Sequence, residues 1–152
     1  MKKAYFKTDK NTPEPIRTIY KRQVRFEEVD LMGVVWHGRY PGYFEEARVA
    51  LSAKYGIGYT DFMAHDHPVP IRKMNLDYVA PLRFADKIEI ETILHWSDAA
   101  KISFEYIIRK GDIIVCTGYT VQMMLDKDFN VMLEAPAFYM AFIQKWQRGE
   151  LT

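Results

Sequence analysis

The chain has 152 residues, of which 49% are hydrophobic and 27% are charged. This length and composition fit one globular domain that buries its own core. The 21 Lys and Arg residues nearly balance the 20 Asp and Glu residues, and the net charge is +1. That balance gives no indication of nucleic-acid binding, although a local basic pocket for a phosphorylated ligand is compatible with it. The single cysteine, Cys116, excludes an intramolecular disulfide.

The first 18 residues are polar and contain Pro13 and Pro15, so we expect a loose or extended arm ahead of one domain that spans residues 19–152. Lys7, Asp9 and Lys10 follow the N-terminal residues at once and leave no apolar h-region, so we expect no cleaved signal peptide. No apolar run reaches the length that crosses a membrane. We therefore expect a cytoplasmic protein without a membrane span.

The first half of the chain predicts one strand and one long helix. Residues 20–28 alternate apolar and polar side chains, which predicts a strand, and residues 29–39 are expected to form a loop. Residues 40–55 carry apolar side chains at helical spacing, and a short turn or helix follows near residues 59–64. The buried stripe of the long helix is expected to contain Tyr43, Phe44, Ala47, Ala50, Leu51 and Tyr55, whereas Glu45, Glu46 and Arg48 lie off it.

The second half changes to the period of strands. Residues 71–78 predict one strand, and residues 88–96, 102–109 and 113–125 predict three more. The short connections between the last three are too short for parallel crossovers, so these strands should form an antiparallel meander. A final amphipathic helix is expected over residues 137–147.

These elements predict an α+β fold in which a curved antiparallel sheet packs its concave face against the long helix. One helix cannot cover both faces of such a sheet. We therefore expect the other face or the edges to find partners by oligomerisation. Cys116 lies in an alternating strand and is interpreted as a packing residue.

The segment with most chemical content runs from the first strand through a loop to the helix start. It carries a carboxylate, Asp30, and an imidazole, His37, on either side of a short apolar stretch. Amides at a helix N-terminus point outward with partial positive charge and can stabilise the oxyanion of a thioester under attack. A nearby carboxylate can attack the carbonyl or activate a water.

This segment resembles a known family. The motif Asp30-x-x-Gly33-Val34-Val35-Trp36-His37-x-x-Tyr40, followed by Tyr43-Phe44-Glu45-Glu46-Ala47-Arg48, is similar to the 4-hydroxybenzoyl-CoA thioesterase family, and most to the branch found with the Tol-Pal genes of bacteria. The segment Ile71–Arg83 resembles the family strand that ends in Tyr-x-Ala-Pro. The resemblance covers roughly residues 20–136.

The resemblance implies a hotdog fold: a curved antiparallel sheet wrapped around one long helix, paired into homodimers or assembled into homotetramers. It implies a catalytic Asp30, a polarising N–H at His37, and a catalytic role for the His37 side chain. The active site would lie at the dimer interface. Coenzyme A would enter as part of the acyl-CoA substrate, with no bound cofactor and no metal.

The resemblance further suggests a set of substrate-binding residues: Gly38, Tyr40, Arg72, Lys73 and Lys101. The last three are the basic residues available for the phosphates of coenzyme A, because the turn at residues 97–100 lacks the basic cluster that some relatives have. Two further departures are Arg39, where the family usually has an Asn that caps the helix, and Phe26, where some members carry a Tyr.

Three alternatives remain open at this stage. The thioester could be carried by an acyl carrier protein instead of coenzyme A, or the protein could be a non-catalytic acyl-CoA-binding module. His65 and His67 could suggest a metal site, but a solvated loop is the favoured interpretation because no further ligand stands at a telling spacing.

Overall fold

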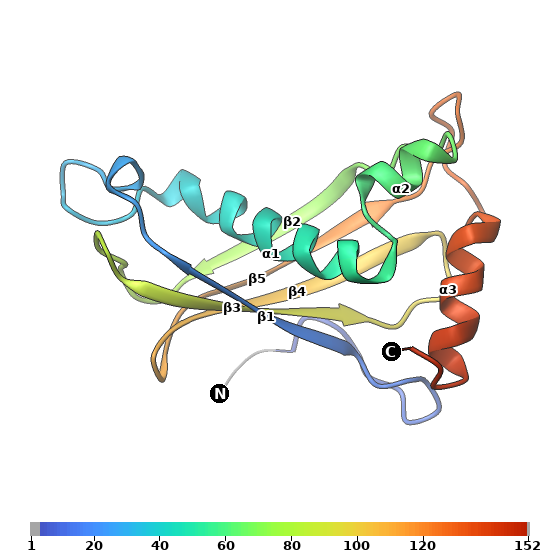
Figure 1. Cartoon of the computed structure of the whole chain (residues 1–152), viewed down its shortest axis with the longest axis horizontal. Helices are drawn as coiled ribbons and strands as arrows, with labels where there is room; N and C mark the ends of the chain where they lie inside the picture. Colours follow the sequence, from blue (N-terminus) through green and yellow to red (C-terminus); the bar gives the residue numbers. More distant parts are fainter. Residues whose placement is uncertain (1–3, 152) are drawn as a thin grey trace.

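The computed structural model describes residues 4–151, in which a five-stranded antiparallel sheet packs against one long helix. Figure 1 shows helix α1 lying across one face of the sheet, with α2 and α3 grouped at one end and the β1–α1 connection at the other. The strands are β1 (Ile16–Gln23), β2 (Ile71–Tyr78), β3 (Lys87–His95), β4 (Lys101–Lys110) and β5 (Ile113–Met123). The α-helices are α1 (Tyr40–Tyr55), α2 (Tyr59–Ala64) and α3 (Ala137–Gln147).

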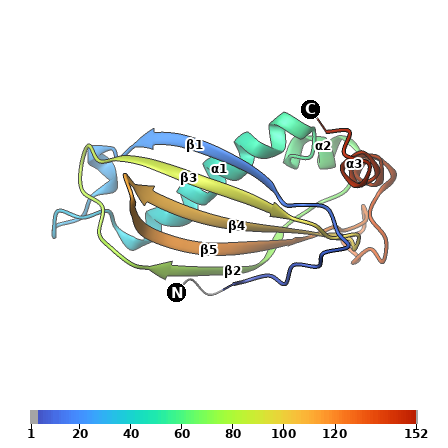
Figure 2. The same ribbon diagram turned by 90° about the horizontal axis from the view of Figure 1, so that it is seen from below.

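The strand order in the sheet is β1-β3-β4-β5-β2, and every pair is antiparallel. The predicted meander of β3, β4 and β5 is confirmed. Strands β1 and β2 occupy the two edges, as Figure 2 shows with α1 behind the sheet. Because β2 pairs only with β5 among the described residues, its other edge carries unpaired backbone groups.

Helix α1 covers the concave face of the sheet, as the aromatic stripe predicted. Tyr43, Phe44 and Leu51 are almost completely buried, and the ring of Phe44 stacks on Tyr106 of β4 at 4.3 Å. This curved antiparallel sheet around one long helix is the hotdog fold that the resemblance implied. Cys116 is fully buried in β5, which confirms its role in packing.

Two residues of α1 contradict the predicted stripe. Ala50 was expected inside it and is exposed, whereas Arg48 was expected outside it and is only 2% exposed. Arg48 reaches under the helix because two phenols, from Tyr59 and Tyr106, accept hydrogen bonds from its guanidinium. Helical spacing could not reveal this contact, because one of the acceptors comes from β4.

The prediction of a strand over residues 20–28 was wrong at both ends. Strand β1 begins at Ile16, which pairs with Leu94, and residues Phe26–Glu28 form a turn of 3₁₀ helix. The carboxylate of Glu28 accepts a hydrogen bond from the Arg25 N–H at 2.8 Å. This bond closes the turn and ends the extended conformation.

The outer face of the sheet, which we expected to need partners, is partly covered by the chain itself. The hydroxyl of Tyr5 hydrogen-bonds Asp77 of β2 and Thr117 of β5, and the ring of Phe6 lies 4.7 Å from that of His95. The arm therefore lies against the sheet. Residues 1–3 of the predicted arm lie outside the described residues.

Candidate active site

The connection from β1 to α1 folds into a short hairpin. Val29 and Val35 form an antiparallel bridge, and the N–H of Asp30 donates to the Val34 carbonyl at 2.9 Å. Gly33 turns the chain with a φ of 76°, a conformation that glycine adopts readily. The Val35 N–H donates to the carbonyl of Leu82 at 2.8 Å, which fixes the hairpin to the segment after β2.

Asp30 stands at the turn of this hairpin and is partly exposed. Its Oδ1 accepts a hydrogen bond from the Met32 N–H at 2.9 Å, which holds the carboxylate at the turn. Leu31 and Met32 at the tip are among the most exposed apolar side chains of the molecule. A carboxylate beside such a tip would lose its water if another surface covered it.

His37 lies where the second arm of the hairpin passes into helix. Residues His37–Arg39 form a 3₁₀ turn that leads directly into α1. The first amides of such a segment have no intrahelical acceptor and point out of the helix. The N–H groups of His37 and Gly38 are therefore available to a ligand oxygen at the positive end of the helix.

Gly38 permits this close approach. A Cβ at position 38 would lie 2.3 Å from the ring of Trp36, so a side chain there would displace the indole. The imidazole of His37 is exposed, and its ring lies 5.1 Å from that of Trp36. No hydrogen bond joins the side chains of Asp30 and His37 in the described part of the chain; one backbone hairpin connects them.

Two long-range contacts hold the helix start. Arg39 makes no side-chain cap, but its guanidinium donates to the Glu27 carbonyl at 3.0 Å. The hydroxyl of Tyr78, at the end of β2, donates to the His37 carbonyl at 2.8 Å. Both contacts donate to backbone carbonyls, so they hold the helix start in place, but neither accepts from a helix amide as an Asn cap would. The Tyr-x-Ala-Pro segment contained this tyrosine, but nothing in the sequence indicated its partner.

Tyr40, expected among the substrate-binding residues, is 3% exposed and packs edge-on against Tyr78 with ring centroids 5.0 Å apart. Burial, with smaller contributions from Cys116 and Tyr78, raises the pKa of Tyr40 to about 12. Its phenol is therefore neutral at physiological pH and supports the wall behind the helix start.

The predicted basic residues lie at the other end of the sheet within one protomer. Arg72 and Lys73 lie near the start of β2, six and five residues before Tyr78, which corresponds to about 20 and about 17 Å of strand. Lys101 begins β4 and pairs with Met123 at the end of β5. All three are exposed. A single protomer therefore does not bring them to Asp30 and His37.

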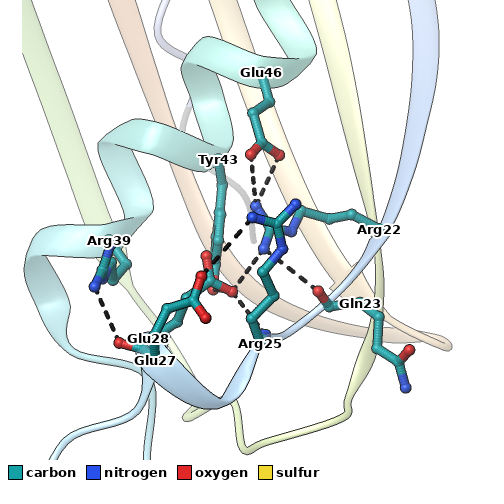
Figure 3. A network of polar contacts seen from close by, with 8 residues as sticks. All are labelled: Arg22, Gln23, Arg25, Glu27, Glu28, Arg39, Tyr43 and Glu46. Atoms are coloured by element: carbon teal, nitrogen blue, oxygen red, sulfur yellow. Dashed lines mark hydrogen bonds and ion pairs between the residues drawn. The ribbon is translucent and has the colours of Figure 1, made fainter.

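A buried ion-pair cluster, which the sequence did not indicate, lies beside the hairpin (Figure 3). Arg22 of β1 donates to Glu28 at 2.6 Å and to both carboxylate oxygens of Glu46 at 2.8 Å. Tyr43 donates to Glu28 at 3.1 Å, and its ring lies under the Arg22 guanidinium. This cluster joins β1, the 3₁₀ turn and α1, and so fixes the position of the hairpin relative to the helix.

Other candidate residues form no site. His65 hydrogen-bonds the Asp61 carbonyl and His67 the Leu125 carbonyl. Within residues 4–151, no three side chains that could ligate a metal come together. No helix in this part of the chain is long and apolar enough to cross a lipid bilayer.

The chain has the hotdog fold, and its Asp30 hairpin leads into the N-terminus of the long helix. The family model described as the thioesterase-like superfamily matches residues 24–146, and the chain belongs to this family. A protein of Aquifex aeolicus, classed provisionally as an esterase, is 33% identical over 107 residues, which cover 70% of this chain and 84% of the relative.

Two further similarities are informative. The acyl-CoA thioester hydrolase YbgC of Escherichia coli is 34% identical over 77 residues, which cover 49% of this chain and 58% of the relative. The solved structure of a DHNA-CoA thioesterase from Staphylococcus aureus superposes with a TM-score of 0.77 at 24% identity and covers 87% of this chain and 91% of that one. At that identity the structural likeness supports the fold alone.

Proposed function

We propose that the protein hydrolyses an acyl-CoA thioester to a carboxylic acid and free coenzyme A. The observation that carries this proposal is the hairpin that joins Asp30 to the free amides of His37 and Gly38. Relatives that are named acyl-CoA thioester hydrolases support the substrate class. The E. coli relative matches only half of this chain. Membership of the Tol-Pal branch and a cytoplasmic location are therefore part of this proposal.

In the proposed reaction the thioester carbonyl accepts a hydrogen bond from the His37 N–H. Asp30 removes a proton from a water, the water oxygen bonds to the carbonyl carbon, and the oxyanion is stabilised at the helix N-terminus. Collapse breaks the C–S bond, and the thiolate of coenzyme A leaves and is protonated. In the nucleophilic variant Asp30 itself bonds to the carbonyl carbon, the C–S bond breaks as the thiolate leaves, and water then hydrolyses the resulting anhydride to the carboxylic acid and regenerates Asp30.

We propose that the His37 side chain assists the departing thiolate. It is exposed at the helix start, next to the amides that would hold the carbonyl. An imidazole there can act as a general acid and donate its proton to the leaving thiolate.

The active site would be completed by a second copy of the chain. Strand β2 has an open edge, and Trp36, Tyr78 and Val79 beside it are about half exposed or more. Antiparallel pairing of two β2 strands about a two-fold axis would cover this apolar surface. It would also bring Arg72 and Lys73 of the partner subunit toward the Tyr78 end, where they could bind coenzyme A phosphates. A homotetramer would pair two such dimers.

The experiment follows free thiol release from a panel of aryl- and alkyl-CoA thioesters. Asp30→Asn should lower turnover by about a hundredfold or more, because it removes the base or nucleophile but keeps the turn. Asp112→Asn, in the exposed β4–β5 turn, is the matched control and should retain wild-type turnover. Light scattering of the same preparations should give at least a dimer. Near-normal turnover by folded Asp30→Asn would contradict the proposal.

A further inference from the structure

A second polar cluster lies farther along α1, away from the hairpin. Arg48 projects from the helix toward the sheet and is only 2% exposed. Its Nη1 donates to the Tyr106 hydroxyl and its Nη2 to the Tyr59 hydroxyl, both at 3.1 Å. The Tyr106 hydroxyl also hydrogen-bonds Thr120 at 2.6 Å. The guanidinium is thus bound by phenols and not by carboxylates.

The positive charge of Arg48 is not neutralised within the described residues. No carboxylate among residues 4–151 lies within ion-pair distance of it, and its buried Nε has no hydrogen-bond partner. Burial raises the pKa of Tyr106, so that phenol is neutral and supplies only a dipole. A guanidinium stays protonated in proteins, and burying one without a counter-ion costs several kcal/mol.

A cavity of about 220 Å³ adjoins this charge. Arg48, Val49, Ser52 and Ala53 of α1 line one side, and residues 57–61 and Gln122 complete the wall. One acidic residue, Asp61, belongs to the lining, but its Oδ2 accepts a hydrogen bond from the Gly58 N–H at 2.9 Å. The cavity therefore combines apolar walls with one buried cation, as small-molecule sites do.

We propose that this cavity binds a carboxylate group against Arg48. A cavity of about 150 Å³ holds a benzene molecule, so the space beside Arg48 accommodates a small apolar group together with a carboxylate. The anion would supply the charge that Arg48 lacks and form charge-assisted hydrogen bonds with it. Apolar Val49, Ala53 and Ile57 would contact the carbon skeleton.

Two sources present this chemistry. Arg48 lies eight residues beyond Tyr40, or about 12 Å along the helix axis from its start. An acyl chain gains about 1.2 Å per bond, so an acyl chain of roughly ten carbons with a carboxylate at its far end spans the distance from the helix start to Arg48. The other source is a free carboxylic acid. The first source rests on the proposed thioesterase function, whereas the second does not.

The binding test is isothermal titration of the full chain with benzoate and with benzamide, its neutral isostere. Benzoate should bind at least about tenfold more tightly than benzamide, because only the anion pairs with Arg48. Arg48→Met should abolish this preference. Ala53→Phe, which fills the cavity from an exposed position and keeps the charge, should weaken both ligands. Lys54→Met removes an exposed cation from the same helix and should change nothing.

The kinetic experiment compares decanoyl-CoA with the CoA thioester of the ten-carbon dicarboxylic acid, in which the far carbon is a free carboxylate. A lower KM for the carboxylate form, lost in Arg48→Met but kept in Lys54→Met, identifies the acyl end as the source. Benzoate binding without such a preference identifies a free acid. Equal affinity for benzoate and benzamide, or benzoate binding unchanged by Arg48→Met, would overturn the proposal. If neither thioester is hydrolysed, the titration alone decides, and only the proposed function fails.

Discussion

Two arginines are buried beside α1, and their surroundings differ in charge. Arg22 binds the carboxylates of Glu28 and Glu46, so its positive charge is compensated inside its own cluster (Figure 3). Arg48, farther along the helix, has only the phenols of Tyr59 and Tyr106, and a cavity adjoins it. A buried charge that is paired within the protein has a structural role, whereas a buried charge without a counter-ion is suited to bind an anion from solution. The first cluster thus positions the hairpin, and the second is a candidate binding site.

The largest expected effect comes from exchanging Arg22 for methionine, with the same exchange at Arg48 as the comparison. Arg22→Met leaves Glu28 buried without its cation and should lower the free energy of unfolding by about 3 to 5 kcal/mol. Arg48→Met removes a buried charge that has no carboxylate partner, so the relief of its desolvation should offset the lost phenol hydrogen bonds, and the free energy of unfolding should not fall. Urea denaturation at equal protomer concentration measures both. Equal losses would mean that both clusters are structural.

A close contact between helix and sheet lies between the two clusters. A Cβ on Gly118 would lie 2.2 Å from the Asn75 carbonyl oxygen and 2.7 Å from the ring of Phe44. Gly118→Ala should therefore cost about 2 to 3 kcal/mol, because backbone and ring must both move. Gly42→Ala, where nothing lies within 4 Å of the new Cβ, should be neutral or stabilise by up to about 1 kcal/mol. If both variants unfold alike, α1 does not depend on this contact.

The smallest effect is expected at the exposed end of the first cluster. Glu46 is bound by both oxygens to Arg22, but its side chain is 37% exposed. Solvent can take over part of this interaction, so Glu46→Gln should cost only about 1 kcal/mol by urea denaturation. A loss as large as that of Arg22→Met would show that Glu46, and not Glu28, carries the neutralisation.

Much of the fold followed from local patterns. The bounds of α1 and α3 matched the prediction because apolar spacing and helix-ending residues are read within one segment. The start of β1 was missed because Ile16 follows two prolines, and its strand conformation depends on pairing with Leu94. The burial of Arg48 was missed for the same reason, since Tyr106 is 58 residues away in the chain.

The candidate site divides in a similar way. Asp30, His37 and Gly38 belong to one hairpin and helix start, so their proximity along the backbone could be expected from the motif. The hydrogen bond from Tyr78 to the His37 carbonyl could not, because it joins β2 to the helix start. The distance of Arg72, Lys73 and Lys101 from this hairpin follows from strand order and register, which alternation alone does not predict.

The central claim is that Asp30 performs thioester chemistry at the start of α1. The most direct measurement is the ratio of kcat/KM for the wild type to that of Asp30→Asn, with the best acyl-CoA of a panel and with Asp112→Asn as control. We predict a ratio of about a hundred or more for Asp30→Asn and near one for Asp112→Asn. A ratio near one for both variants, in folded oligomers, would contradict the claim.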